Sequence, residues 1–219
     1  MRLYHFLGAD HALGDLKQGR LKIARLDDLN DPFELLAAEL RDKAMRRLFT
    51  ETRAEIARTR GVLCFSRGWR NPLMWSHYAD RHRGVCLGFD VPSGKFARIA
   101  YDAKRLPDIL PKLLAGPIAS QEQTMLKLLT TKFRDWKYED EVRVFTTLDT
   151  VDPVNGLYFA DFGDELVLKT VVLGSRFAGQ AAEFVNACRG KYNGAKVFTA
   201  RLAFRTFNIV ERKGSAIVV

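Results

Sequence analysis

The sequence predicts an α+β fold with a mainly antiparallel, split sheet flanked by helices, in a single domain that spans residues 1–219. Short runs of strand-forming residues recur along the chain, and helical patterns fall between them without the regular rhythm of βαβ units. The hydrophobic content of 47% and the charged content of 28% are typical of an ordinary globular protein. A chain of this length can bury a sizeable core, and no stretch has the composition of a domain linker.

The first half of the chain alternates between short strands and helices. Strands are expected where apolar and aromatic residues cluster, at residues 3–6, from 21–23 onward, at 62–66 and at 84–89. Helical patterns cover residues 11–16, 34–60 and 72–79. Gly19 and Gly61 end the first two of these helices, and Pro72 occupies the first turn of the third. Residues 26–33 hold a close succession of turn residues and are expected to form a loop.

The second half is expected to contain two more helices and most of the remaining strands. The helical stretches are residues 107–134, interrupted near Gly116 and Pro117, and residues 178–188. The strands are residues 97–101, a run entered at 136–143 and continued to 147, the very apolar run 166–173, and finally 197–202 and 206–210. Residues 149–156 are expected to form a loop.

The net charge of +9 favours a polyanionic partner, such as a nucleic acid, or an anionic small molecule such as a dinucleotide. Cys64, Cys86 and Cys188 are odd in number and lie in apolar runs, so we expect buried free thiols in a reducing compartment. No apolar run approaches the ~20 residues of a membrane span, and the N-terminus lacks the features of a signal peptide. These observations predict a cytoplasmic protein without a membrane partner.

The most informative segment is residues 136–143, where two glutamates flank an aspartate at the entry to a strand. On a strand, Glu139 and Glu141 would project to one face and Asp140 to the other. Two carboxylates on one face repel each other unless a cation or a hydroxyl group lies between them. Such a pair can hold a sugar hydroxyl or stabilise a developing positive charge. The alternative is a solvated strand edge on which Arg143 is a cross-strand partner.

Other polar residues are candidates for ligand contacts, although each also has a structural explanation. Tyr4 and His5 on the opening strand can bind ribose hydroxyls or stack on a ring, but His5 alone is better explained as a half-buried strand residue. Ser66 ends a buried strand, and His77 is the best-placed polar candidate on its helix, where Tyr78 belongs to the expected core stripe.

The loop before residue 34 is explained by a capped helix start, or presents Asn30 or Asp31 to a ligand. The histidines lack metal-binding spacing, and the Gly-rich nucleotide motifs are absent from the sequence.

Six motifs in this order resemble a widespread bacterial family of uncharacterised function: LYHF at 3–6, NDPFE at 30–34, CFS at 64–66, MWSHYA at 74–79, GVCLGF at 84–89 and WKYEDEVR at 136–143. That family in turn resembles the ADP-ribosyltransferases, which bind NAD in a cleft of a split sheet. The resemblance implies an ADP-ribosyltransferase-like fold with NAD as the substrate. Arg2, Tyr4 or His5 would match the first motif of those enzymes, Ser66 the second and Glu141 the third.

The resemblance also implies roles for these residues. Glu141 would stabilise the oxocarbenium-like ribose, and Glu139 would orient the acceptor or take its proton. His5 or Arg2 would hold the ribose or pyrophosphate, Ser66 would support Glu141, and His77 and Tyr78 are further candidates for cofactor contacts. The sequence departs from the toxin branch, because Cys64-Phe65-Ser66 replaces Ser-Thr-Ser.

The leading expectation is an NAD-consuming ADP-ribosyltransferase-like enzyme in a toxin or phage-defence role. It would modify a nucleic-acid or protein acceptor or hydrolyse NAD, and a neutralising partner would accompany it. The alternative is a non-catalytic module that binds a nucleotide or nucleic acid. A third hypothesis is a metal-dependent nuclease that uses Asp31, Glu139 and Glu141.

Overall fold

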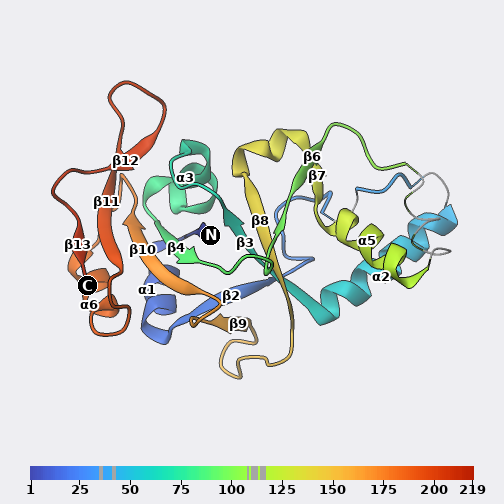
Figure 1. Cartoon of the computed structure of the whole chain (residues 1–219), viewed down its shortest axis with the longest axis horizontal. Coiled ribbons are helices and arrows are strands. Elements are labelled where there is room, and N and C mark those ends of the chain that lie inside the picture. The colour runs from blue at the N-terminus through green and yellow to red at the C-terminus, as the bar shows by residue number, and fades with distance from the viewer. Residues whose placement is uncertain (35–36, 41–42, 108, 110–112, 114–116) are drawn as a thin grey trace.

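The computed structural model describes residues 1–34, 37–40, 43–107, 109, 113 and 117–219. Helices flank an open, mainly antiparallel sheet (Figure 1). The strands are β1 Arg2–Leu7, β2 Arg20–Arg25, β3 Arg60–Ser66, β4 Val85–Asp90, β5 Ala97–Arg98, β6 Ala100–Asp102, β7 Thr131–Phe133, β8 Glu141–Thr147, β9 Tyr158–Asp161, β10 Val167–Leu173, β11 Lys196–Leu202, β12 Ile209–Glu211 and β13 Ile217–Val218. The helices are α1 Ala9–Gln18, α2 Lys43–Thr59, α3 Pro72–Tyr78, α5 Ile118–Leu129 and α6 Ala181–Cys188, with 3₁₀ helices η1 Asp80–His82 and η2 Arg134–Glu139.

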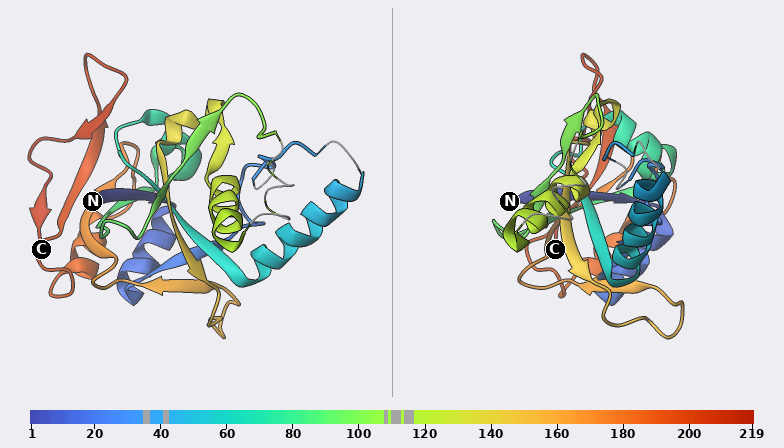
Figure 2. Two further views of the ribbon diagram at one scale, coloured as in Figure 1. Left: turned by 45° about the vertical axis from the view of Figure 1, so that its right-hand side comes forward. Right: turned by 90° about the vertical axis from the view of Figure 1, so that its right-hand side faces the viewer.

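The main sheet runs in the order β12-β11-β10-β4-β1-β3-β2-β9, and β8 joins it along β3. The β10–β11 pair is parallel, whereas the other pairs in this order are antiparallel. The helices α2 and α5 lie at one end of the molecule, and α6 lies with β11 and β13 at the other (Figures 1 and 2). The prediction of a mainly antiparallel sheet flanked by helices is confirmed.

The sheet divides beside β3, and this division positions the candidate site. β8 pairs with β3 along its whole length, from Arg60–Thr147 to Ser66–Glu141. The other edge of β3 is shared, because β2 pairs near its start, at Gly61 and Val62, and β1 pairs only at its last residue, Ser66. Between these two pairings β1 and β2 diverge, so the middle of that edge of β3 lacks a strand neighbour among the described residues.

Three apolar clusters hold the elements together. The largest packs α1 and α6 against the sheet through residues such as Leu16, Leu87 and Phe184. A second lies under α2 and α5, and a third packs Trp75 of α3 against the sheet around Phe6. The apolar runs that predicted strands at 62–66, 84–89 and 166–173 therefore supply core residues of β3, β4 and β10.

Two predicted helices are shorter in the structure. The helix expected over 34–60 begins only at Lys43 in α2, because the backbone of residues 37–39 bonds to Leu106: Leu106 N–H donates to Ala37 O at 2.6 Å, and Glu39 N–H donates to Leu106 O at 3.0 Å. The stretch expected to be helical over 107–134 forms α5, but residues 131–133 pair with β6 as a strand and η2 follows. The expected interruption at Gly116 lies outside the described residues.

Two strand predictions also need correction. The strand expected over 97–101 is interrupted at Ile99, where the chain changes partners: Ile99 N–H donates to Glu141 O at 3.1 Å and Ala100 N–H to Thr130 O at 2.7 Å. The strand expected over 206–210 begins only at Ile209, as β12. The prediction also missed two short strands: β9, most of whose residues are half-buried, and β13, whose two residues are exposed.

We expect Gly174→Ala to lower the free energy of unfolding by roughly 1–3 kcal/mol. An added Cβ would lie 2.1 Å from the backbone oxygen of His82 and 2.9 Å from that of Gly84, to which Gly174 N–H donates. Gly14 in α1 is the matched control, because its Cβ would have nothing within 4 Å, and Gly14→Ala should stabilise by about 0.5–1 kcal/mol. Urea denaturation measures both variants, and equal stabilities would contradict this account.

Candidate functional site

A cavity of about 830 Å³, with its open mouth included, lies where β1 and β2 diverge from β3. The part of it in which a water molecule fits measures about 240 Å³, just below the roughly 300–1,000 Å³ typical of small-molecule sites. Its walls come from β1, β2, β3, the loop after β2, α3, β7, η2 and β8. The polar residues that line it include Tyr4, His5, Lys22, Asn30, Glu34, Ser66, Tyr78, Lys132, Glu139, Glu141 and Arg143.

Glu139 and Glu141 both face the cavity, but not because they alternate along a strand. Glu139 is the last residue of η2, Asp140 adopts a left-handed conformation with φ of 46°, and β8 begins only at Glu141. The prediction that all three lie on one strand is therefore wrong. Asp140 does point away, and it forms an ion pair with Arg67 at 2.5 Å. An aspartate tolerates the left-handed region better than most residues, so the turn brings both glutamates to one place.

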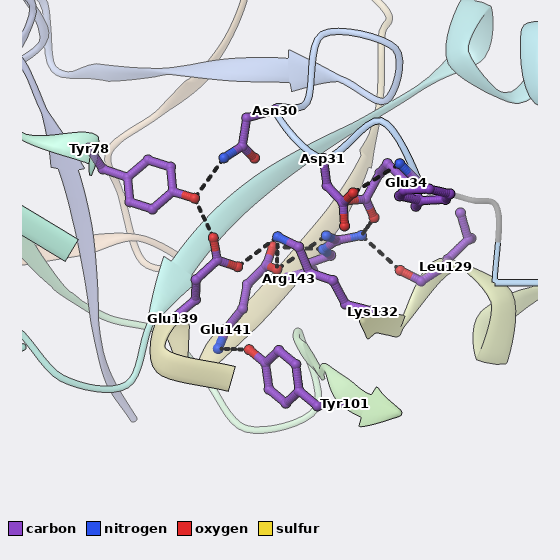
Figure 3. A network of polar contacts seen from close by, with 11 residues as sticks. Asn30, Asp31, Glu34, Tyr78, Tyr101, Leu129, Lys132, Glu139, Glu141 and Arg143 are labelled. Atoms are coloured by element: carbon purple, nitrogen blue, oxygen red, sulfur yellow. Dashed lines mark hydrogen bonds and ion pairs between the residues drawn. The ribbon is translucent and has the colours of Figure 1, made fainter. Parts of the chain in front are cut away.

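Lys132 lies between the two glutamates, as the repulsion between paired carboxylates requires. Its Nζ is 2.6 Å from Glu139 Oε2 and 3.4 Å from Glu141 Oε2 (Figure 3). Burial acts to lower the pKa of Lys132, but Glu141 and Glu139 outweigh it, and the net pKa is raised. The ammonium group also lies 4.6 Å from the centre of the Trp136 ring. Lys132 therefore stays charged inside the cavity wall.

Arg143 clamps the second glutamate from the other side. Its Nε lies 2.7 Å from Glu141 Oε1 and its Nη2 lies 3.2 Å from Glu141 Oε2, which is a bidentate arrangement. Its Nη1 donates to Glu34 and to the backbone oxygen of Leu129 (Figure 3). The Arg143 side chain is 1% exposed, so the guanidinium depends on these carboxylates in place of water. Arg143 is thus part of the buried site and not a partner on a solvated edge.

The buried cluster carries more carboxylates than cations. Glu34, Glu139 and Glu141 face Lys132 and Arg143, which leaves a net charge of −1 when all five groups are ionised. One oxygen of Glu34, Oε2, is buried and has no hydrogen-bond partner among the described residues. Such an oxygen is an acceptor that a ligand hydroxyl or a water can satisfy.

The two glutamates differ in their tendency to take up a proton. Burial raises the pKa of Glu139, and Lys132 and the Tyr78 hydroxyl only partly oppose it. Burial also acts to raise the pKa of Glu141, but Arg143 and Lys132 outweigh it, and the net pKa is lowered. Glu141 is therefore the permanent anion of the pair, and Glu139 is the one suited to exchange a proton.

Tyr78 and Asn30 extend the network from Glu139 toward the cavity mouth. The Tyr78 hydroxyl donates to Glu139 Oε1 and accepts a hydrogen bond from Asn30 Nδ2 at 2.7 Å. Burial raises the pKa of Tyr78, and the adjacent carboxylate raises it further, so the phenol stays protonated. The loop at residues 30–34 was expected either to cap a helix or to present Asn30 or Asp31 to a ligand, and the structure places Asn30 in the cavity wall. Asp31 has a structural role, because its Oδ1 accepts from Phe33 N–H at 2.9 Å.

His5 bridges the opening between the diverging strands. Its Nδ1 lies 2.8 Å from the backbone oxygen of Cys64 on β3. A carbonyl only accepts, so Nδ1 carries the proton and Nε2 of the neutral ring keeps a lone pair. Burial lowers the pKa of His5, and the neutral form is therefore favoured. Burial raises the pKa of the Cys64 thiol far above its ordinary value, which argues against a nucleophilic thiolate.

The remaining candidates separate into two groups. Tyr4 and Ser66 line the cavity, and Ser66 is paired with Glu141 in the β3–β8 ladder. The Ser66 hydroxyl accepts from Gly68 N–H at 3.3 Å, whereas no hydrogen bond joins it to the Glu141 carboxylate among the described contacts. Arg2 and His77 do not line the cavity: Arg2 pairs with Asp90 at 2.6 Å, and the His77 ring lies 5.8 Å from that of Tyr138.

Sequence reasoning missed Glu34 as a member of the site and misassigned Arg143. Arg143 could have been found, because residues two apart on a strand share a face and Glu141 had been identified. Glu34 had no such signal, since it reaches Arg143 from 109 positions away in the chain.

One family model matches part of this chain. A model of the family described as "Protein of unknown function (DUF2971)" matches residues 74–144, which include Tyr78, Lys132, Glu139, Glu141 and Arg143. No curated protein and no solved structure matches the chain. No helix among the described residues is long and apolar enough to cross a membrane.

Proposed function

We propose that this protein is an NAD-consuming enzyme of the ADP-ribosyltransferase type, which breaks the bond between nicotinamide and ribose in the cavity beside β3. The observation that carries the proposal is the meeting of the expected motif residues in one place. His5, Ser66 and Glu141 come from three distant segments, and all three line the cavity together with Tyr4 and Tyr78. The ADP-ribosyltransferase-like fold and the toxin or phage-defence role, with a neutralising partner, rest on the sequence resemblance.

The excess negative charge of the buried cluster supports this chemistry. The nicotinamide ring of NAD is positively charged, and the ribose takes over that charge as the bond breaks. A net charge of −1 about 4 Å away would stabilise the oxocarbenium by about 4 kcal/mol at an effective dielectric constant of 20. That free energy corresponds to a rate increase of at most roughly a thousandfold, because the nicotinamide ring of bound NAD already carries the positive charge. The same negative cluster argues against placing the pyrophosphate of NAD beside Glu141.

The proposed step exchanges nicotinamide for an acceptor at ribose C1′. The bond between ribose C1′ and the nicotinamide nitrogen breaks, and its electron pair neutralises the ring, which leaves as nicotinamide. Glu141, held by Arg143, faces the cationic ribose. An acceptor hydroxyl, amine or water attacks C1′ and loses its proton to Glu139, whose pKa is raised by burial. His5 Nε2 and Glu34 Oε2 are acceptors for ribose hydroxyls.

A second candidate function has its own support. Both oxygens of Glu141 already lie near cationic nitrogens, from Arg143 and Lys132. A carboxylate so neutralised can serve to hold the cavity together, and the protein would then be a module that binds a nucleotide without turnover.

Nicotinamide release from NAD by the purified full chain tests the proposal. We expect release that depends on protein concentration and is measured with and without added nucleic acid and protein. Calorimetry measures NAD binding in parallel. His77→Ala is the control, because His77 lies outside the cavity, and it should change the rate by less than about twofold. Binding without release with any acceptor would favour the binding module. The absence of both binding and release would overturn NAD consumption and leave a module that binds another nucleotide or a nucleic acid.

A further inference from the structure

The connection between β11 and β12, residues 203–208, exposes two aromatic side chains on a projecting hairpin. Figures 1 and 2 show this hairpin extending beyond the rest of the molecule at the end that holds β11 and β13. Phe204 is 91% exposed and Phe207 is 97% exposed. Isolated exposed apolar residues are ordinary, but two nearly uncovered phenylalanines within four residues form a surface available to a partner.

The hairpin has internal contacts that define its shape. Ala203 N–H donates to Asn208 O at 2.9 Å, and Asn208 Nδ2 donates to Thr206 Oγ1 at 3.1 Å. The Arg201 guanidinium lies 4.5 Å from the centre of the Phe204 ring. The two rings are therefore presented by a closed turn with a cation beside one of them.

The charge around the hairpin is strongly positive. Between residues 196 and 213 there are five basic residues and one acidic residue, Glu211. Glu211 pairs with Lys196 at 2.6 Å, and neither Arg201 nor Arg205 forms an ion pair among the described residues. Aromatic rings that alternate with uncompensated cations match the bases and phosphates of a single-stranded nucleic acid, because bases stack on the rings while the cations contact the backbone.

The base of the hairpin is joined to the candidate site. Ile209 N–H donates to Arg70 O at 2.8 Å, and Arg70 belongs to the loop that runs from Ser66, in the cavity wall, to α3. The same loop contacts the segment before Glu139, since Asn71 Nδ2 donates to Tyr138 O at 2.8 Å. A nucleic-acid strand bound to the hairpin would thus lie on an element that is hydrogen-bonded to the loop bordering the cavity.

We propose that the hairpin at residues 203–208 is a docking platform for single-stranded nucleic acid, which stacks on Phe204 and Phe207 and contacts Arg201 and Arg205 through its phosphates. The role of this nucleic acid as the acceptor of the ADP-ribosyl group rests on the proposed function. Its binding to the hairpin does not rest on that function and can be measured without NAD.

Fluorescence anisotropy with labelled oligodeoxythymidine and oligouridine of 20 nucleotides tests the platform, on the full chain and at several salt concentrations. Phe204→Ala and Phe207→Ala should each weaken binding about 5- to 100-fold, with an unchanged salt slope because no charge is removed. Arg205→Ala should weaken binding and lower the slope. Val154→Ala is the matched control, since Val154 is 91% exposed in another loop, and it should leave the affinity unchanged.

Three results for the double variant Phe204→Ala/Phe207→Ala would overturn the platform. The first is an unchanged affinity for the oligonucleotides. The second is weaker binding to vesicles of anionic lipid with oligonucleotide binding retained, and the third is loss of a self-association that the wild type shows. Failure here is distinguishable from failure of NAD cleavage, because nicotinamide release is also measured in the absence of nucleic acid and oligonucleotide binding in the absence of NAD. A protein that releases nicotinamide and ignores oligonucleotides would keep the proposed function and lose this acceptor.

Discussion

Replacing Arg143 with methionine is expected to lower the free energy of unfolding by about 3–5 kcal/mol, which is the usual cost of leaving a buried charge without its partner. Methionine keeps an unbranched apolar stem, but Glu34 and Glu141 lose their guanidinium. Lys132 alone would then neutralise three buried carboxylates. Urea denaturation at pH 7 measures this loss.

The stability of Arg143→Met should depend on pH in the opposite sense to that of the wild type. In the wild type, cations hold the folded pKa of Glu141 below its ordinary value, so its contribution to stability is present above the unfolded pKa and is lost as the pH falls through the folded pKa. In Arg143→Met the sign reverses. Burial then raises the folded pKa of the carboxylates, and the variant should regain stability relative to the wild type as the pH falls from 7 toward 5.

An exposed ion pair supplies the matched comparison for Arg143. Arg47 pairs with Glu51 at 3.0 Å along α2, and both side chains are more than half exposed. Arg47→Met should change the free energy of unfolding by less than about 0.5 kcal/mol. Similar losses in Arg143→Met and Arg47→Met would show that the buried cluster contributes no more than a surface pair.

Local patterns in the sequence predicted the central strands and most helix ends, because those elements are dictated by nearby residues. Apolar runs sufficed for β3, β4 and β10, and Asn71 caps α3 through Leu73 N–H as expected for a helix beginning at Pro72. Residues 37–40 have strong helix formers but lie in an extended segment bonded to Leu106, so tertiary contacts overrode propensity. No local pattern could have indicated a partner so far along the chain.

The candidate site shows the same division between local and distant information. The sequence predicted that Glu139 and Glu141 face the same side, but it did not predict the left-handed turn at Asp140 that brings them there. His77 and Tyr78 are neighbours, and one helical step of about 100° separates their directions. The sequence placed His77 as the better polar contact, but the orientation of α3 in the fold directs the Tyr78 hydroxyl to Glu139. Which of two adjacent helix residues faces the cavity is therefore decided by how the helix packs in the fold.

Glu141→Gln is expected to lower kcat for nicotinamide release by at most roughly a thousandfold, the limit set by a loss of about 4 kcal/mol of electrostatic stabilisation. The substitution conserves shape and removes one negative charge, so the cluster of Glu34, Glu139, Lys132 and Arg143 becomes neutral. The effect should fall on kcat, because the ribose gains its positive charge as the bond breaks. The affinity for NAD, measured by calorimetry, should change less than about tenfold.

Stability must be measured on the same variant, since Glu141 also holds Arg143. Arg143 keeps Glu34 and the Leu129 carbonyl as acceptors in Glu141→Gln, so we expect a folded protein with an unfolding transition at a lower urea concentration. A variant that folds, binds NAD and still releases nicotinamide at the wild-type rate would remove Glu141 from the chemistry. A folded variant that loses NAD binding together with turnover would assign Glu141 to ground-state binding. Only a loss confined to kcat agrees with a carboxylate that stabilises the cationic ribose.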